Sequence, residues 1–149
     1  MIRLTADAFD PVAELAAFAP PSGIGALASF TGYVRAEGNC VEALDLDHHH
    51  HLTLASIEAI ERSTRDRFDL ADLLIIHRHG RVLPGEPIVL VAAAARHRRA
   101  AFDAVDYAMD LLKIEAVLWK KEVRADGDRW IEPRPEDHID RRRWERADG

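Results

Sequence analysis

The chain has 149 residues, of which 48% are hydrophobic and 31% charged, so it is long enough to bury the core of one soluble domain. Its single cysteine, Cys40, excludes a disulfide framework and a paired-cysteine site for redox chemistry or zinc. The formal net charge of -6 argues against general nucleic-acid binding, which usually requires an excess of lysine and arginine.

No composition break, repeat or low-complexity linker divides the chain, so we expect a single domain over residues 1–149. No apolar stretch reaches the roughly 20 residues that cross a bilayer, and the first residues lack the basic-then-apolar layout of a signal peptide. These features predict a cytoplasmic protein without a membrane anchor.

The N-terminal part is predicted to hold a short strand, a short helix and a pair of strands. Asp10 followed by Pro11 is typical of a helix start, because aspartate caps the first turn and proline fits the first helical position. The prolines at 20–21 would end this helix. Residues 25–34 and 41–47 have the pattern of strands, joined by the turn RAEGN.

The middle of the chain is predicted to form an amphipathic helix and then strands. Apolar residues recur at helical spacing over residues 53–68, which gives a helix with a charged outer face. The apolar runs at 72–76 and 88–95 are separated by the turn-rich HGRVLPGEP. The second run is continuous enough to be a strand that is buried on both faces.

The clearest helix lies near residues 98–116, where apolar residues recur every three or four positions from Phe102 onwards. Asp-Gly at 126–127 predicts a hairpin between VLWKKEV and DRWIE. The charged tail from Pro133 is predicted to be partly disordered. The predicted order of elements mixes hairpins with helices, which favours the α+β class over a doubly wound parallel sheet. This order is strand, helix, two strands, helix, three strands, helix and two strands.

Two arginine-containing segments are candidates for binding an anion. Arg96-His97-Arg98-Arg99 lies where the buried strand gives way to the long helix, so its side chains and the N–H groups of the helix start could bind a phosphate. The alternative is a solvated cap, although cations at a helix start oppose the helix dipole by a few tenths of a kcal/mol. Arg35 follows a strand and precedes a glycine-containing turn, where a side chain either reaches into a site or decorates the surface.

Lysines occur at the end of the long helix and in the strand after it. Lys113 shares a helix face with Asp106 and Asp110, and an ordinary ion pair with Asp110 would explain it. Lys120 and Lys121 are adjacent in a predicted strand, so they point to opposite faces, and the pattern does not say which one is buried. A buried lysine has a lowered pKa and can act as an acid, base or nucleophile near neutral pH.

Half of the eight histidines lie in one run, LDHHHHL, at residues 46–52. Consecutive strand residues alternate faces, whereas metal-binding pairs need spacings such as i,i+4 on a helix, so a metal site is not favoured. A purification tag is not expected at an internal position. We interpret the run as a turn between a strand and the helix that begins near Thr53.

Six segments, taken in chain order, resemble the large catalytic subunit of molybdopterin synthase. They are SFTGYVR, IIHRHG, PGE before the buried strand, RHRRAAF at the start of the long helix, MDLLKIEAVLWKKE and GDRWIE. The similarity covers residues 25–132. Each motif is weak alone, but six in order with sensible spacing are specific.

The resemblance implies an alpha/beta-hammerhead fold and a homodimer of large subunits, with a small ubiquitin-like subunit at each end of a heterotetramer. In that family, the small subunit carries a thiocarboxylate on its C-terminal Gly-Gly, and this tail enters a pocket of the large subunit. Two sulfurs pass in succession to cyclic pyranopterin monophosphate, giving the dithiolene of molybdopterin. With one isolated cysteine and no final Gly-Gly, this chain is expected to be neither the sulfur store nor the carrier. The resemblance implies no resident metal or cofactor.

The resemblance also assigns roles to residues that match the family's motifs. Lys113 of DLLK and Lys120 of LWKK match its two functional lysines, which suit proton transfer or attack on the thiocarboxylate. The implied substrate-binding residues are Tyr33, Val34, Arg35, His97, Arg98, Lys113, Lys120, Lys121 and Glu122. In the family, the residues that match His97 and Arg98 act from the neighbouring protomer.

The chain departs from the family's pattern at two places. Tyr33 stands where relatives often have lysine, and HHHHL replaces a usual His-Tyr-Pro-Gly-Met.

Two other functions would also use features of this sequence. A non-catalytic phosphate- or nucleotide-binding module would use Arg35 and the cluster at 96–99 but would not need paired lysines. A metal-binding protein would use the histidine run.

Overall fold

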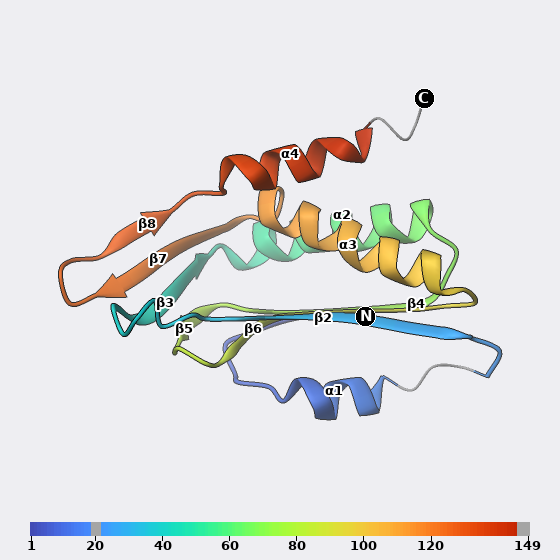
Figure 1. The fold of residues 1–149 in the computed structure, drawn as a ribbon, viewed down its shortest axis with the longest axis horizontal. Helices are drawn as coiled ribbons and strands as arrows, with labels where there is room; N and C mark the ends of the chain where they lie inside the picture. The colour runs from blue at the N-terminus through green and yellow to red at the C-terminus, as the bar shows by residue number, and fades with distance from the viewer. Residues whose placement is uncertain (19–21, 146–149) are drawn as a thin grey trace.

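The structure, a computed structural model, describes residues 1–18 and 22–145 and belongs to the predicted α+β class. Its elements follow the predicted order, with one further helix near the C-terminus (Figure 1). In chain order they are β1 (Ile2–Thr5), α1 (Pro11–Ala17), β2 (Ala26–Tyr33), β3 (Val41–His48), α2 (His50–Arg67), β4 (Leu70–Arg78), β5 (Gly80–Val82), β6 (Pro87–Ala95), α3 (Arg98–Ile114), β7 (Leu118–Arg124), β8 (Arg129–Ile131) and α4 (Pro135–Arg143). Within these described ranges, no helix combines the length and apolar character that a membrane crossing requires.

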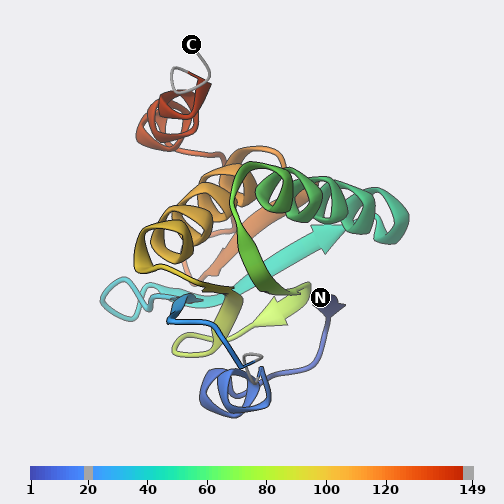
Figure 2. The same cartoon turned by 90° about the vertical axis from the view of Figure 1, so that its right-hand side faces the viewer.

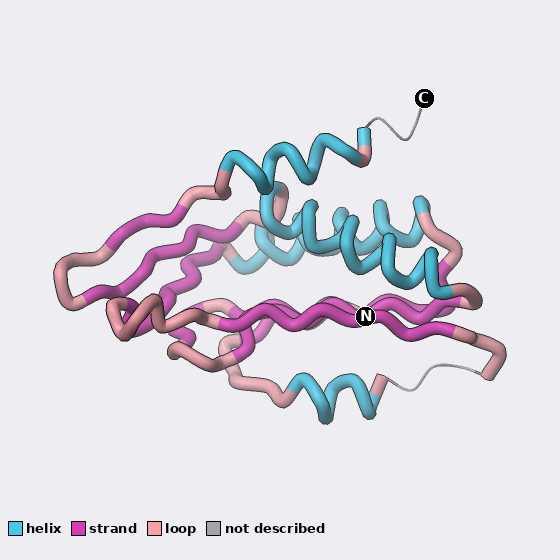
Figure 3. The backbone as a smooth tube through the Cα atoms, viewed as in Figure 1, coloured by secondary structure: helices cyan, strands magenta, loops and turns pink. Residues whose placement is uncertain are grey.

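The first sheet has the strand order β1-β4-β6-β2 and forms the central layer of the molecule (Figure 3). β1 runs parallel to β4, whereas β6 pairs antiparallel with both of its neighbours, β4 and β2. The residues of β6 from Val89 to Ala95 are all buried, which confirms a strand covered on both faces. β2 is an edge strand, and its Leu27, Phe30 and Tyr33 are exposed.

Helices α2 and α3 cover one face of this sheet, and α1 covers the other (Figure 2). The side of α3 that faces the sheet is rich in alanine, with Ala101, Ala104 and Ala108 inaccessible to solvent. They belong to the same core as Ala93 and Ala95 of β6. Small side chains on both surfaces let α3 lie close to the sheet without a void, and this packing fixes the position of the C-terminal end of α3.

The start of α1 is as predicted. The Asp10 carboxylate accepts a hydrogen bond from the backbone N–H of Val12 at 2.9 Å, which confirms Asp10 as the N-cap. The helix ends at Ala17, and Phe18 packs in the core on the second face of the sheet. The predicted stop at the prolines 20–21 lies outside the described residues.

The second sheet has the order β5-β3-β7-β8, and all its pairs are antiparallel. The predicted hairpin between β7 and β8 is confirmed, with Lys120 opposite Ile131 and Lys121 opposite Trp130. Its turn contains Gly127 at a φ of 116°, a conformation that residues with a Cβ rarely adopt.

In the charged tail, for which the sequence predicts partial disorder, residues 135–143 form α4. This helix lies against α3 on the side away from the sheet (Figure 1). Arg143 pairs with Asp106 and Asp110, both at 2.7 Å, and the Trp144 ring packs edge-on against Tyr107. Few apolar residues mark α4 in the sequence, since its contacts with α3 are mostly charged.

The histidine run also differs from its prediction. Helix α2 begins at His50, three residues before the predicted start at Thr53, and His49 is its N-cap residue. His48 is the last residue of β3. The run is therefore a direct junction between strand and helix, and half of it is helical.

Candidate functional site

The C-terminal end of α3 meets both sheets at a cavity of about 580 Å³. Figure 1 shows β7, β8 and the beginning of α4 converging on this end of the helix. The end of β2, the end of α3, β7 and the segment from β8 into α4 each supply part of the lining. Because these segments are distant in sequence, the cavity is a product of the tertiary structure.

The cavity brings together the two lysines that the resemblance marks as functional. The chain has three lysines, all of them between residues 113 and 121. Lys113 is exposed in the last turn of α3, Lys120 is half-buried on β7, and both line the cavity. A helix end and a strand thus deliver two amines to one place.

The ammonium group of Lys120 loses its proton unusually easily. Burial and, to a smaller extent, the nearby charge of Lys113 lower the pKa of Lys120 from 10.5 to about 8, against the opposing effect of Asp137. An amine with this pKa has both protonation states available near neutral pH, so it can accept a proton and return it.

Lys121, in contrast, points away from the cavity. Its ammonium nitrogen lies 4.0 Å from the Asp45 carboxylate and 3.7 Å from that of Asp128. The same nitrogen lies 5.6 Å from the centre of the Trp130 ring. The pairing of β7 therefore decides what the sequence left open: Lys120 faces inward, and Lys121 is an outer-face residue, apart from the other implied substrate contacts.

The implied substrate contacts at the end of β2 do line the cavity. Tyr33 is exposed and Val34 is buried, while the side chain of Arg35 is 83% exposed and lies 3.3 Å from Glu37. Glu122 of β7 lines the cavity as well. The rim of the cavity thus has a guanidinium group that is placed to meet an anion.

His97 and Arg98 are not near this cavity within one chain. They lie at the N-cap and first residue of α3, whereas Lys113 is in its last turn. Arg98 and Lys113 are fifteen positions apart, which corresponds to roughly 22 Å along the helix axis. In a single copy of the chain, the basic cluster and the lysine pair are therefore separate.

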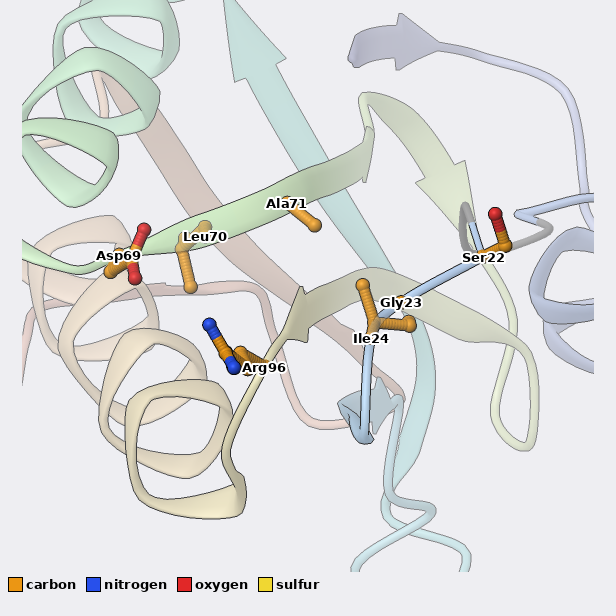
Figure 4. A pocket seen from close by; sticks show the side chains of 7 residues that line it. All are labelled: Ser22, Gly23, Ile24, Asp69, Leu70, Ala71 and Arg96. Carbon is orange, nitrogen blue, oxygen red and sulfur yellow. The ribbon is translucent and has the colours of Figure 1, made fainter.

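A smaller hollow of about 290 Å³ lies at the cluster end of α3. Figure 4 shows Arg96 opposite Asp69 and Leu70 at the beginning of β4, with residues 22–24 beyond them. Arg96 lines this hollow, but its lining does not include His97, Arg98 or Arg99. The hollow is therefore not the anion site that the whole cluster was predicted to form.

Sequence reasoning did not single out several titratable residues that line the lysine cavity, among them His77, Arg134 and Asp137. Arg134 and Asp137 lie in the tail that the sequence predicts as partly disordered, so no signal marked them. The Asp137 carboxylate accepts hydrogen bonds from the Arg134 backbone at 2.8 Å and from its guanidinium at 3.2 Å. Burial raises the pKa of Asp137, but these bonds and the charge of Lys113 outweigh burial and lower it. Asp137 is thus a carboxylate beside the lysines.

The alternative for Lys113, an ordinary surface ion pair with Asp110, is not what the structure shows. The Asp110 carboxylate instead accepts hydrogen bonds from Trp144 Nε1 and from the Arg143 guanidinium, each at 2.7 Å. The C-terminal end of α4 thus binds the Asp110 carboxylate, and Lys113 lines the cavity instead.

The histidine run lies away from the cavity lining. The ring of His48 stacks on that of His79, with 3.8 Å between the ring centres. Over residues 1–18 and 22–145, no three metal-binding side chains are grouped in a way that could hold an ion. The structure thus gives no observation in favour of a metal-binding function.

The fold and the site together define a class of protein: an α+β domain whose cavity is lined by two lysines and, at its rim, by an arginine. The model of the MoaE protein family matches residues 4–115, and the chain belongs to this family. The molybdopterin synthase catalytic subunit of Caulobacter vibrioides is 45% identical to the chain over 146 residues, which cover 97% of both chains.

Solved structures agree with this assignment. The molybdopterin biosynthesis MoaE protein from Burkholderia ambifaria has a TM-score of 0.82 at 42% identity, with 97% of each chain covered. A complex of subunits 1 and 2 of molybdopterin-converting factor from Helicobacter pylori contains a chain with a TM-score of 0.75 at 24% identity. That match covers 89% of this chain and 91% of the other, and it shows a shared fold. The fold expected from the resemblance is confirmed.

Proposed function

We propose that this chain is the catalytic subunit of a molybdopterin synthase, which transfers sulfur to cyclic pyranopterin monophosphate. The sulfur would come from the C-terminal thiocarboxylate of a small ubiquitin-like subunit whose tail enters the lysine cavity. The observation that carries the proposal is the meeting of Lys113 and Lys120 in one cavity, in a chain of the MoaE family. The alternative of a non-catalytic phosphate-binding module explains neither the lysine pair nor the named relatives.

The chemistry requires groups that move protons. In each transfer, the carbon–sulfur bond of the thiocarboxylate breaks and a carbon–sulfur bond forms on the pterin, where an oxygen substituent leaves as its carbon–oxygen bond breaks. Water supplies the oxygen that turns the tail into a carboxylate. Lys120, with a pKa of about 8, suits proton removal and return during these steps, or direct attack on the thiocarboxylate as a neutral amine. Lys113, on the opposite wall, can donate hydrogen bonds to the developing negative charge.

The cavity offers cationic groups to an anionic substrate. Four basic residues, Arg35, Lys113, Lys120 and Arg134, line it together with four acidic ones, Glu37, Glu122, Glu132 and Asp137. Because Arg35 pairs with Glu37 and Arg134 with Asp137, the two lysines are the cations that attract the anion in our proposal. Tyr33, Val34 and Glu122 complete the substrate contacts in our proposal, and Lys121, which pairs with Asp45 and Asp128 on the outer face, is not among them.

The edge strand β2 supports a homodimer in which His97 and Arg98 serve the neighbouring protomer's cavity. The first residue of β2, Ala26, pairs with Ala95 next to the basic cluster, and its last residue, Tyr33, lines the lysine cavity. If two copies paired antiparallel through β2, each cluster would lie beside the other copy's cavity. Two such protomers, each with one small subunit, would make the heterotetramer.

The test of the function is product formation from a thiocarboxylated small subunit and the pyranopterin. We expect Lys113→Ala and Lys120→Ala to lower the turnover rate by about 10²–10⁴-fold, the usual contribution of a proton-transfer group. Binding of the small subunit, measured by calorimetry, should change little. Lys121→Ala is the matched control and should retain most activity, because Lys121 faces outward.

The decisive negative result is an absence of dithiolene product from the unaltered chain, although the small subunit binds. In that case the proposed function is wrong. Equal losses in all three lysine variants would instead contradict the role of the cavity, since Lys121 does not line it.

A further inference from the structure

The turn Leu83-Pro84-Gly85-Glu86 joins β5 to β6, and no role has been given to it. A hydrogen bond of 3.0 Å from the Glu86 N–H to the Leu83 carbonyl oxygen closes the turn. Pro84 is its second residue, and Gly85, the third, has a φ of 85°, as a type II turn requires. The segment PGE thus specifies a tight turn.

This turn holds Val34 through both of its backbone polar groups. The Val34 N–H donates to the Glu86 carbonyl oxygen at 3.1 Å, and the Gly85 N–H donates to the Val34 carbonyl oxygen at 2.9 Å. The pairing of β2 with β6 shifts register immediately before Tyr33. Beyond that irregularity, the turn therefore takes over from the strand pairing in fixing the end of β2, where Tyr33, Val34 and Arg35 line the cavity.

A buried guanidinium group anchors the turn. The side chain of Arg78 is 5% exposed, and its Nη1 donates to Oε2 of Glu86 at 3.0 Å. The same oxygen accepts a second hydrogen bond from the Leu83 N–H at 2.9 Å. Nη2 of Arg78 donates to the carbonyl oxygens of Ala6 at 3.0 Å and Arg81 at 3.3 Å. Arg78 thus ties the turn to two other segments of the backbone.

The carboxylate of Glu86 remains charged in this setting. The hydrogen bond from Leu83, and next the one from Arg78, lower the pKa of Glu86. A buried ion pair is weak evidence for stability, because removing the charges from water offsets much of their attraction. The geometry that the pair imposes on the turn is therefore its more informative consequence.

We propose that Arg78 and Glu86 are positioning residues, which hold the turn at 83–86 against Val34 and so keep the end of β2 in place for the substrate. This inference rests on the proposed function, because it concerns the substrate contacts of the lysine cavity. Neither side chain lines that cavity, so both act through the turn. Without the pair, Tyr33 and Arg35 would lose their fixed place, while the lysines would keep theirs.

The first test measures amide hydrogen exchange and does not depend on activity. In Glu86→Ala, we expect the Val34 amide to exchange roughly tenfold faster than in the unaltered chain, because the turn that binds it is released. The Gly25 N–H donates to the Ala95 carbonyl oxygen at 3.2 Å at the other end of β2 and should keep its rate. Glu86→Gln should retain the protection of Val34, since one amide oxygen can accept both bonds that Oε2 accepts.

Two further variants control for the loss of charge and for folding. Asp45→Asn removes another ion pair of the second sheet, in which Arg81 donates to the Asp45 carboxylate at 2.8 and 3.0 Å. Asp45 does not bind the turn, so this variant should leave Val34 exchange and KM unchanged. If Glu86→Ala does not fold because Arg78 is left as an unpaired buried charge, the double variant Arg78→Met/Glu86→Ala removes both charges and should show the same faster exchange.

The second test separates KM from kcat in the sulfur-transfer assay. We expect Glu86→Ala to raise KM for the pyranopterin by roughly tenfold and to leave kcat within about twofold, because binding contacts are lost while the lysines keep their place. Glu86→Gln should retain most of the original KM. A general loss of folded protein would instead lower kcat and leave KM unchanged.

Unchanged Val34 exchange, or an unchanged KM, in both Glu86→Ala and the double variant would overturn the inference. If the unaltered chain forms no product, the proposed function fails instead, and hydrogen exchange still decides whether Arg78 and Glu86 hold Val34.

Discussion

At the scale of single residues, the cavity combines groups that differ in how they handle a proton. Arginine keeps its proton under all physiological conditions, so Arg35 and Arg134 can bind and orient an anion but cannot transfer a proton. Burial brings the pKa of Lys120 down to about 8 and that of His77 to about 4, so one amine can titrate near neutral pH while the imidazole remains neutral. Site chemistry thus follows from burial as much as from residue type.

The buried imidazole of His77 predicts a pH dependence of stability. Its pKa is 6.5 in the unfolded chain and about 4 in the folded one, so between these values the unfolded chain binds one more proton. The free energy of unfolding should therefore fall by about 3 kcal/mol as the pH drops from about 6.5 to about 4. Urea unfolding across this range measures it. His77→Gln should lack this component, and parallel curves for the two proteins would contradict the prediction.

At the scale of elements, α3 and α4 together build the upper wall of the site. The alanine-rich face of α3 fixes the helix against β6, and its C-terminal turn presents Lys113 where the helix dipole favours a cation. α4 then binds α3 through Arg143 and Trp144, and its first turn brings Asp137 to the lysines. The position of Asp137 thus depends on contacts at the other end of α4.

Trp144→Ala tests this attachment. The half-buried ring packs against Tyr107 with 5.2 Å between ring centres and donates a hydrogen bond to Asp110. We expect the free energy of unfolding to fall by about 2 kcal/mol, less than for a fully buried tryptophan. Trp130→Ala is the control, since Trp130 is 61% exposed, and it should cost less than about 1 kcal/mol. Equal losses in chemical denaturation would mean that α4 is not held on α3 in solution.

At the scale of the whole molecule, a single copy of the chain places its basic cluster and its lysine pair at opposite ends of α3. Only a second copy could unite His97 and Arg98 with Lys120. The exposed side chains of the edge strand β2, Leu27, Phe30 and Tyr33, lie between these two ends and give a surface for that copy.

Mixed dimers test the shared site. Arg98→Ala and Lys120→Ala should each reduce activity when purified alone. In a dimer that contains one of each, both defects fall on one site if Arg98 acts across the interface, so the other site is intact. Co-expression at equal amounts should then restore about a quarter of the wild-type rate, since half of the dimers are mixed. No gain over the separate variants would show that Arg98 serves the cavity of its own chain or none.

Local patterns were sufficient for most of the fold. The apolar spacing after Phe102 predicts α3, the capping pair at Asp10 predicts the start of α1, and the Asp-Gly turn at 126–127 predicts the β7–β8 hairpin. In each case the signal lies within a few residues of the element that it specifies. The predicted start of α2 was three residues too late. The residue at the true N-cap, His49, makes no side-chain capping hydrogen bond, so no capping residue marks the helix start within the histidine run.

The sequence by itself determined the elements from β1 to β8, the α+β class and, through motif order, the family and the two lysines. The tertiary structure decided which lysine faces inward, because the pairing of β7 with β3 and β8 turns Lys121 outward. It also brought in His77 and Asp137 and ordered the charged tail as α4, since these depend on contacts between segments far apart in the chain. Short-range periodicity specifies backbone conformation, whereas burial and charge partners, which set the pKa of each group, exist only once the chain is folded.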